Sequence, residues 1–383
     1  MNDSSNPARR RRREAALVIG VGIASALVVL AAIAAADLRT GDRFDLVRWE
    51  RMTLPGKWLY LLGAPLRRDP APDVAIARYF AAPAGSEERR RLEGAVEASV
   101  TGRIDAALRT RGLRGAVPLP GTVFPPVNIE LTQPPRVLVE SPRAIIQRSG
   151  TELLRPDLTT DAAVAIERVT EAAHPDRSAL VVASGGVAAY PAIVDNSDTY
   201  ADTLSTAAHE WTHHYLAFYP LGLHYFDSRD ATTINETVAD IVGAEIGADV
   251  LARWGDPTRP AGAPAPSAPR AAPRGPDVNA TLRDLRREVD ALLAAGKVAE
   301  AEARMETVRQ QLWDGGYRIR RLNQAYFAWY GSYAARPDAI DPLGGQLREL
   351  RTRAGSLAAF LAVVRDTTSR AEVAGALESL RAR

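Results

Sequence analysis

The 383-residue sequence contains no cysteine. This absence excludes disulfide bonds, a thiolate nucleophile and cysteine ligands for zinc, so that histidine and carboxylate side chains are the only strong metal ligands left. It does not identify a redox compartment. An excess of one charge is also lacking, because 48 Lys and Arg balance 46 Asp and Glu. The resulting net charge of +2 gives no reason to expect a nucleic-acid partner.

Histidine is scarce, and its placement is uneven. Only five histidines occur, and three of them fall within six residues, at His209, His213 and His214. The first two belong to an H-E-x-x-H pattern, His209-Glu210-Trp211-Thr212-His213. Residues four apart share one face of a helix, so His209 and His213 can present two imidazole nitrogens to one ion. Glu210 is then placed beside a metal-bound water rather than on the metal.

Two histidine ligands leave a catalytic zinc site one protein ligand short. Glu236 is the predicted third ligand, and it lies near the start of an Ala- and Val-rich helical pattern that runs to about Leu251. Asp240, one turn further along the same face, could accept the second ring N–H of a ligating histidine and fix its tautomer. Asn235, beside Glu236, is predicted as a second supporting residue. The alternative is a solvated His/Glu helix face without a metal.

These motifs resemble those of the gluzincin zinc metallopeptidases, the clan of thermolysin, over roughly residues 202 to 247. The resemblance implies a zincin-like domain, Zn²⁺ on His209, His213 and Glu236, and Asp240 as the support of a ligand histidine. More loosely, the chain resembles a bacterial family of predicted membrane-associated aminopeptidases. That family carries a Leu-Asn-x-Ala segment in its helical C-terminal part, which here is Leu322-Asn323-Gln324-Ala325.

The chain departs from these families in two respects. No histidine follows His224, so the downstream transition-state histidine of thermolysin has no counterpart. Gluzincin aminopeptidases use a tyrosine on a later helix instead, and the resemblance makes Tyr326 and Tyr330 candidates for that role. Both lie in a stripe with Tyr333 that packing alone would also explain. The G-x-M-E-N sequence of one large aminopeptidase family is absent, so an aminopeptidase is only slightly favoured and endopeptidase action stays open.

The N-terminus has the pattern of a membrane anchor. Residues 1–14 are polar and contain five consecutive arginines, and residues 15–36 are uncharged and apolar. At about 1.5 Å per residue this run spans roughly 33 Å, enough to cross the hydrocarbon core of a bilayer. The arginines predict a cytoplasmic N-terminus and an extracytoplasmic remainder from Asp37 onward. A cleavable signal peptide is the alternative, since the small residues at the end of the run, Ala34 to Ala36, resemble a cleavage site.

The remainder is predicted as a juxtamembrane and helical segment over 37–120 and a metallopeptidase domain over 121–383, with a Pro/Ala-rich insert at about 256–278. The expected fold class is α+β, mostly helical, with a small sheet before the H-E-x-x-H helix. Strands are predicted at 127–131, 136–140, 179–183 and 187–194. Pro191 indicates that the last is an edge strand. In gluzincins such an edge pairs with extended substrate backbone, and an ordinary edge hairpin is the alternative.

Taken together, these features predict a single-pass, membrane-anchored zinc peptidase that hydrolyses peptide or protein substrates outside the cytoplasmic membrane. The alternative is a non-catalytic, membrane-tethered scaffold with a structural or absent metal. Glu210 favours catalysis, because a structural zinc site does not need a carboxylate at that position.

Overall fold

The computed structural model describes residues 41–62, 71–114, 121–259, 277–334, 336–337 and 339–382. The predicted basic tail 1–14 and membrane anchor 15–36 lie outside these residues, as does most of the predicted insert at 256–278. Within the described ranges, no helix combines the length and the apolar character needed to span a bilayer.

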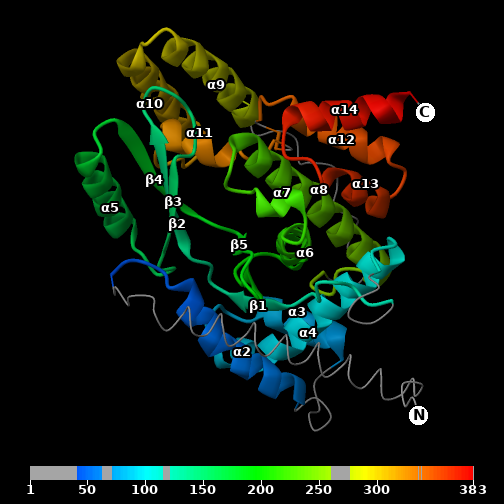
Figure 1. Cartoon of the computed structure of the whole chain (residues 1–383). Coiled ribbons are helices and arrows are strands. Elements are labelled where there is room, and N and C mark those ends of the chain that lie inside the picture. The colour runs from blue at the N-terminus through cyan, green and yellow to red at the C-terminus, as the bar shows by residue number, and fades with distance from the viewer. Residues whose placement is uncertain are drawn as a thin grey trace, which may run out of the picture.

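The predicted α+β class is confirmed, with helices dominating and two small sheets in the described part of the chain (Figure 1). The first sheet is antiparallel, in the order β3-β2-β4, with β2 at Arg136–Pro142, β3 at Gly150–Leu154 and β4 at Arg177–Ala183. The second has the order β1-β6-β5, in which β1 (Ile129–Thr132) runs parallel to β6 (Ala192–Asp195), and β5 (Gly186–Val187) runs antiparallel to β6.

The first sheet is buried on both faces, because side chains alternate along each strand. Leu138 and Val181 pack with α5 (Thr160–Ala173) on one face. Val139 and Leu180 pack with α11 (Gln324–Tyr330) on the other face, against Ala325. Figure 1 shows the sheet between these two helices.

The largest hydrophobic core joins helices from both ends of the described chain. Its helical members are α3 (Pro72–Ala81), α4 (Glu87–Thr110), α6 (Tyr200–Leu216), α8 (Arg229–Trp254), α12 (Leu343–Arg353), α13 (Leu357–Val364) and α14 (Arg370–Arg381). β1 and β6 close the same core through Ile129 and Val194. The sequence predicts a boundary at residue 120, between a juxtamembrane helical segment and the metallopeptidase domain. Helices from both sides of that boundary share this one core.

Three smaller helical pieces complete the described fold. α9 (Val278–Ala294) and α10 (Val298–Asp314) form a helical hairpin, with Gly296 at a positive φ of 74° in the turn. α7 (Pro220–Leu223) is a single turn between α6 and α8. α2 (Leu46–Leu62) is attached through Lys57, whose Nζ lies 2.7 Å from the carbonyl of Ile129 and 2.6 Å from Glu130, and also contacts Glu97.

The second sheet corrects one prediction. The predicted strand 187–194 is two strands, and the one after Pro191 is the central strand β6 rather than an edge strand. Pro191 lies just before β6, so its missing N–H removes no hydrogen bond from the ladder. The edge strands of this sheet are β1 and β5. β3 has no counterpart among the strands predicted from the sequence.

α6 and α8 approach closely because α8 carries two glycines at the contact. A Cβ atom on Gly243 would lie 2.6 Å from the carbonyl oxygen of Ser205, and one on Gly247 would lie 2.6 Å from the hydroxyl of Ser205. The contact at Gly243 is with backbone, so only glycine permits this spacing of the two helices there, whereas at Gly247 the Ser205 hydroxyl would have to move.

We expect Gly243→Ala to destabilise the protein by about 1–3 kcal/mol, because the added methyl group meets backbone rather than a flexible side chain. Gly375→Ala is the matched control, since it also lies in a helix but has open space around its Cβ position. That change should stabilise the protein by about 0.5–1 kcal/mol through helix propensity. Denaturant unfolding of both variants measures the difference, and equal effects would contradict the packing argument.

Candidate metal centre

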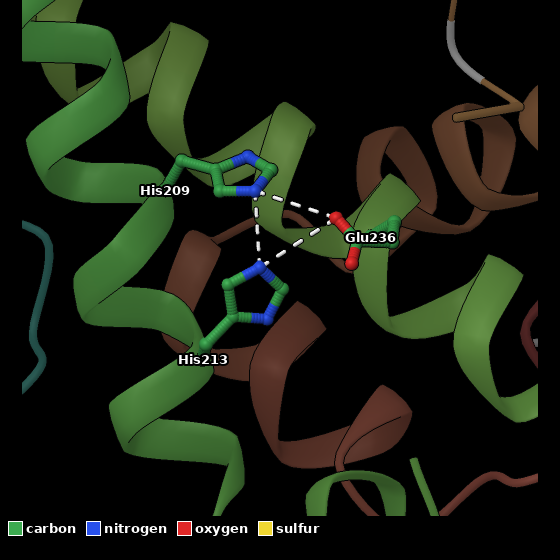
Figure 2. Close-up of side chains that lie close together, drawn as sticks. All are labelled: His209, His213 and Glu236. Atoms are coloured by element: carbon green, nitrogen blue, oxygen red, sulfur yellow. Dashed lines mark hydrogen bonds and ion pairs between the residues drawn. The ribbon is translucent and has the colours of Figure 1, made fainter. Parts of the chain in front are cut away.

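The predicted site residues come from two helices that begin with side-chain caps. Thr199 caps α6 by accepting a hydrogen bond from the backbone N–H of Asp202, and Ser228 caps α8 in the same way through Ala231. His209 and His213 lie one turn apart on α6, on the side that faces α8. Figure 2 shows both rings pointing toward the carboxylate of Glu236 on α8.

The three predicted ligands lie within reach of one ion. The Nε2 atoms of His209 and His213 are 3.0 Å apart. Oε2 of Glu236 is 3.5 Å from Nε2 of His209 and 3.6 Å from Nε2 of His213. Two ligand atoms about 2.1 Å from a tetrahedral ion are about 3.4 Å apart, so the spacing fits zinc.

The hydrogen bonds behind the rings fix which ring nitrogen carries a proton. Asn235 donates from Nδ2 to the carbonyl of Leu221 at 3.2 Å, so its Oδ1 faces Nδ1 of His213, at 2.7 Å, as an acceptor. Nδ1 of His209 lies 3.1 Å from Oδ1 of Asp240, which also accepts. Both rings therefore carry their proton at Nδ1 when neutral and direct a lone pair from Nε2 into the site.

This donor set fits a divalent cation for an electrostatic reason. Two nitrogen lone pairs and a carboxylate oxygen converge on a single point, and their mutual repulsion is relieved only by a positive charge between them. The set of two imidazoles and one carboxylate also leaves a fourth position open to water, as in catalytic zinc sites.

The close approach of these side chains shifts the pKa values of His209 and Glu236 in opposite directions. Burial lowers the pKa of His209, but hydrogen bonds to Asp240 and Glu236 outweigh burial and raise it well above its usual value. Burial raises the pKa of Glu236, but the charges of His213 and His209 and their hydrogen bonds hold it well below its usual value. Without a metal, a proton on His209 balances the charge of Glu236, so metal binding must displace that proton.

Glu210 is buried beside the three ligands and faces β5. A Cβ atom on Gly186 would lie only 2.5 Å from Oε1 of Glu210, so only a glycine leaves room for this carboxylate. Burial raises the pKa of Glu210, although the charges of His209 and His213 oppose the shift. The carboxylate that the H-E-x-x-H pattern predicts as a base thus adjoins the edge strand of the second sheet.

Two residues that the sequence analysis did not predict support Glu236. The hydroxyl of Tyr225 donates a hydrogen bond to Oε1 of Glu236, the oxygen turned away from the histidines. Arg148, from the β2–β3 connection, donates from Nη2 to the same hydroxyl at 3.2 Å. Burial, and then the charge of Glu236, raise the pKa of Tyr225 far above its usual value, so it stays protonated. No sequence pattern predicts either residue, because both lie in loops.

The tyrosine stripe is placed differently from the prediction. α11 ends at Tyr330, so Tyr333 lies beyond the helix, and its ring centroid is 6.4 Å from that of His209. Burial, and then the charge of Glu236, raise the pKa of Tyr333 well above its usual value. Tyr326 packs against the rings of Phe327 and Tyr330 and borders two hydrophobic clusters. The structure therefore adds Tyr333 to the candidates Tyr326 and Tyr330.

The remaining predicted features are structural. Nε2 of His214 bonds to the carbonyl of Ala189 at 2.6 Å, and His224 pairs with Asp227 at the surface. In the Leu-Asn-x-Ala segment, Asn323 caps α11 and donates to the carbonyl of Ala179, so this segment fixes α11 to β4.

The described residues contain one other group of carboxylates close enough to share an ion: Glu93, Glu97 and Glu130. Lys57 already places a positive charge against Glu97 and Glu130. This group is therefore an ion-pair cluster that holds α2 to α4 and β1, not a second metal candidate.

Comparison with known proteins gives no match: no protein-family model, curated protein or solved structure corresponds to this chain.

We expect the full-length protein to bind about one Zn²⁺ per chain and Glu236→Ala to lose that ion, because two imidazoles alone make an incomplete site. Asp240→Ala should weaken binding by about 10–100-fold, since it removes the acceptor that orients His209. Competition with a chromogenic chelator measures both. Glu245→Ala, further along α8, is the control and should bind like the wild type. A folded protein that rejects zinc would contradict the site.

Proposed function

We propose that this protein is a zinc-dependent peptidase of the gluzincin type. The observation that carries the proposal is the convergence of His209, His213 and Glu236 on one point, with a buried Glu210 next to it. A Zn²⁺ bound there would lower the pKa of a bound water toward neutrality and polarise a substrate carbonyl.

Glu210 is the general base in this proposal. Its carboxylate takes a proton from the attacking water and later gives it to the leaving amine. The raised pKa of Glu210 suits this double role, because a carboxylate that holds its proton more tightly is both a stronger base and an effective carrier.

β5 is the proposed contact for the substrate backbone. It is the terminal strand of its sheet in the order β1-β6-β5, and Gly186 on it adjoins Glu210. An extended peptide that adds to this edge would run past the base with its carbonyl groups in register with the strand. Because β5 is short, we expect side-chain pockets to contribute much of the selectivity.

Tyr333 is the proposed donor to the developing oxyanion. Its high pKa keeps the hydroxyl protonated, and a neutral phenol donates a hydrogen bond without adding charge to the ground state. The position of its ring against His209 favours Tyr333 over Tyr326 and Tyr330, the candidates from the sequence.

The proposed setting follows from the sequence alone. The arginine run and the apolar residues 15–36 support a single-pass anchor with the peptidase outside the cytoplasmic membrane. A membrane-tethered scaffold with a structural metal is the second candidate. The buried carboxylate of Glu210 disfavours it, because a structural site does not need a buried base that costs desolvation energy.

Glu210→Gln should abolish hydrolysis of a peptide library while leaving zinc content unchanged, because the amide keeps the shape of the side chain but accepts no proton. Mass spectrometry of the digested library, read beside metal analysis, checks this expectation. Glu245→Gln on α8 is the control. Wild-type protein that holds zinc but cleaves no peptide would instead support the scaffold.

Tyr333→Phe should lower kcat by about 10²-fold or more with little change in KM, because the hydroxyl acts only on the charge that develops in the transition state. Tyr326→Phe and Tyr330→Phe serve as comparisons and should stay close to wild type. If one of these two shows the kcat loss and Tyr333→Phe does not, the assignment made from the sequence is the right one.

A further inference from the structure

A cavity of about 330 Å³ lies between the β2–β3 connection, the start of α8 and the end of α11. Its lining includes Arg148, Arg229 and Ser149 as polar groups and Phe226 and Phe327 as apolar ones. Thr232, one turn before Glu236 on α8, is also part of the wall. The cavity is thus connected to Glu236 through Thr232 on α8 and through Arg148, which contacts Tyr225.

Neither arginine that lines this cavity forms an ion pair within the described ranges. Arg148 donates one hydrogen bond, to the hydroxyl of Tyr225, and no described carboxylate pairs with it directly. Arg229, an exposed residue in the first turn of α8, likewise has no carboxylate in direct contact among the described residues. A guanidinium carries five N–H donors, so most of those on Arg148 remain available to a ligand.

The one acidic residue in the lining is already engaged. Asp227 lies 2.6 Å from Nδ1 of His224. Glu236 acts on Arg148 and Asp341 on Arg229 only from beyond ion-pair distance, so both guanidinium groups keep N–H donors for an anion from outside.

We infer that this cavity binds a carboxylate of the peptide substrate, an inference that rests on the proposed peptidase function. A carboxylate accepts two parallel hydrogen bonds from a guanidinium, and the apolar wall formed by Phe226 and Phe327 would pack against the aliphatic carbons that carry it. The carboxylate belongs either to an acidic side chain or to the C-terminus of the peptide. The chemistry recognised is the same in both cases.

The test measures peptide binding rather than cleavage. The full-length protein with Glu210→Gln is loaded with zinc and titrated with hexapeptides in which a single Glu, or Gln as its neutral match, is moved through each position. Each peptide is made with a free and with an amidated C-terminus. We expect at least one carboxylate to improve the dissociation constant by about tenfold or more. Dependence on Glu identifies a side chain, and dependence on the free C-terminus identifies the terminal group.

Arg229→Gln should remove this preference and leave zinc content unchanged, because Arg229 makes no contact with the ligand residues in the described structure. Arg148→Gln should also remove it, but it also releases Tyr225, so its zinc content is measured alongside. Arg168→Gln, on the exposed side of α5, is the matched control and should keep the preference.

Two outcomes separate this inference from the peptidase proposal. Equal affinity for acidic and neutral peptides, in a protein that cleaves peptides, would overturn the carboxylate pocket and leave the peptidase standing. Carboxylate-dependent binding that Arg229→Gln abolishes, in a wild-type protein that cleaves nothing, would support the pocket and overturn the peptidase.

Discussion

The close contact between α6 and α8 is the constraint on which the rest of the molecule depends. Gly243 and Gly247 let the two backbones approach closely, and a side chain at Gly243 would meet the backbone of α6. At that distance two imidazoles from one helix and a carboxylate from the other reach a common point. The large core of flanking helices, from α3 and α4 to α12–α14, holds the pair in place, so the site inherits the rigidity of the most buried part of the protein.

The three residues at this point are held by polar side chains, which are in turn held by others further out. Asp240 and Asn235 orient the histidines, and Tyr225 binds the outer oxygen of Glu236. Arg148 in turn binds Tyr225 and borders the neighbouring cavity. Asn235 and Asp240 lie on α8 itself, and Tyr225 lies in the connection between α6 and α8. Arg148 lies much earlier in the chain, between β2 and β3. Any ligand that displaces Arg148 would therefore act on Glu236 through one intervening hydroxyl, which couples the cavity to the metal centre in physical terms.

In the proposed peptidase, helices, a strand and loops have different roles. The helices supply the metal ligands and the base, which must be positioned to within a fraction of an ångström. The short strand β5 offers backbone groups, and the loops around Arg148 and Phe226 supply the cavity.

The sequence by itself determined the local parts of this protein. Helical spacing put His209 beside His213 and Glu236 beside Asp240, because such spacing depends only on near neighbours in the chain. Only the tertiary structure decided which strands pair, so β3 was missed and Pro191 was misassigned. It also brought Arg148, Tyr225 and Tyr333 to the site, since loop positions follow from packing between distant segments and leave no periodic pattern in the sequence.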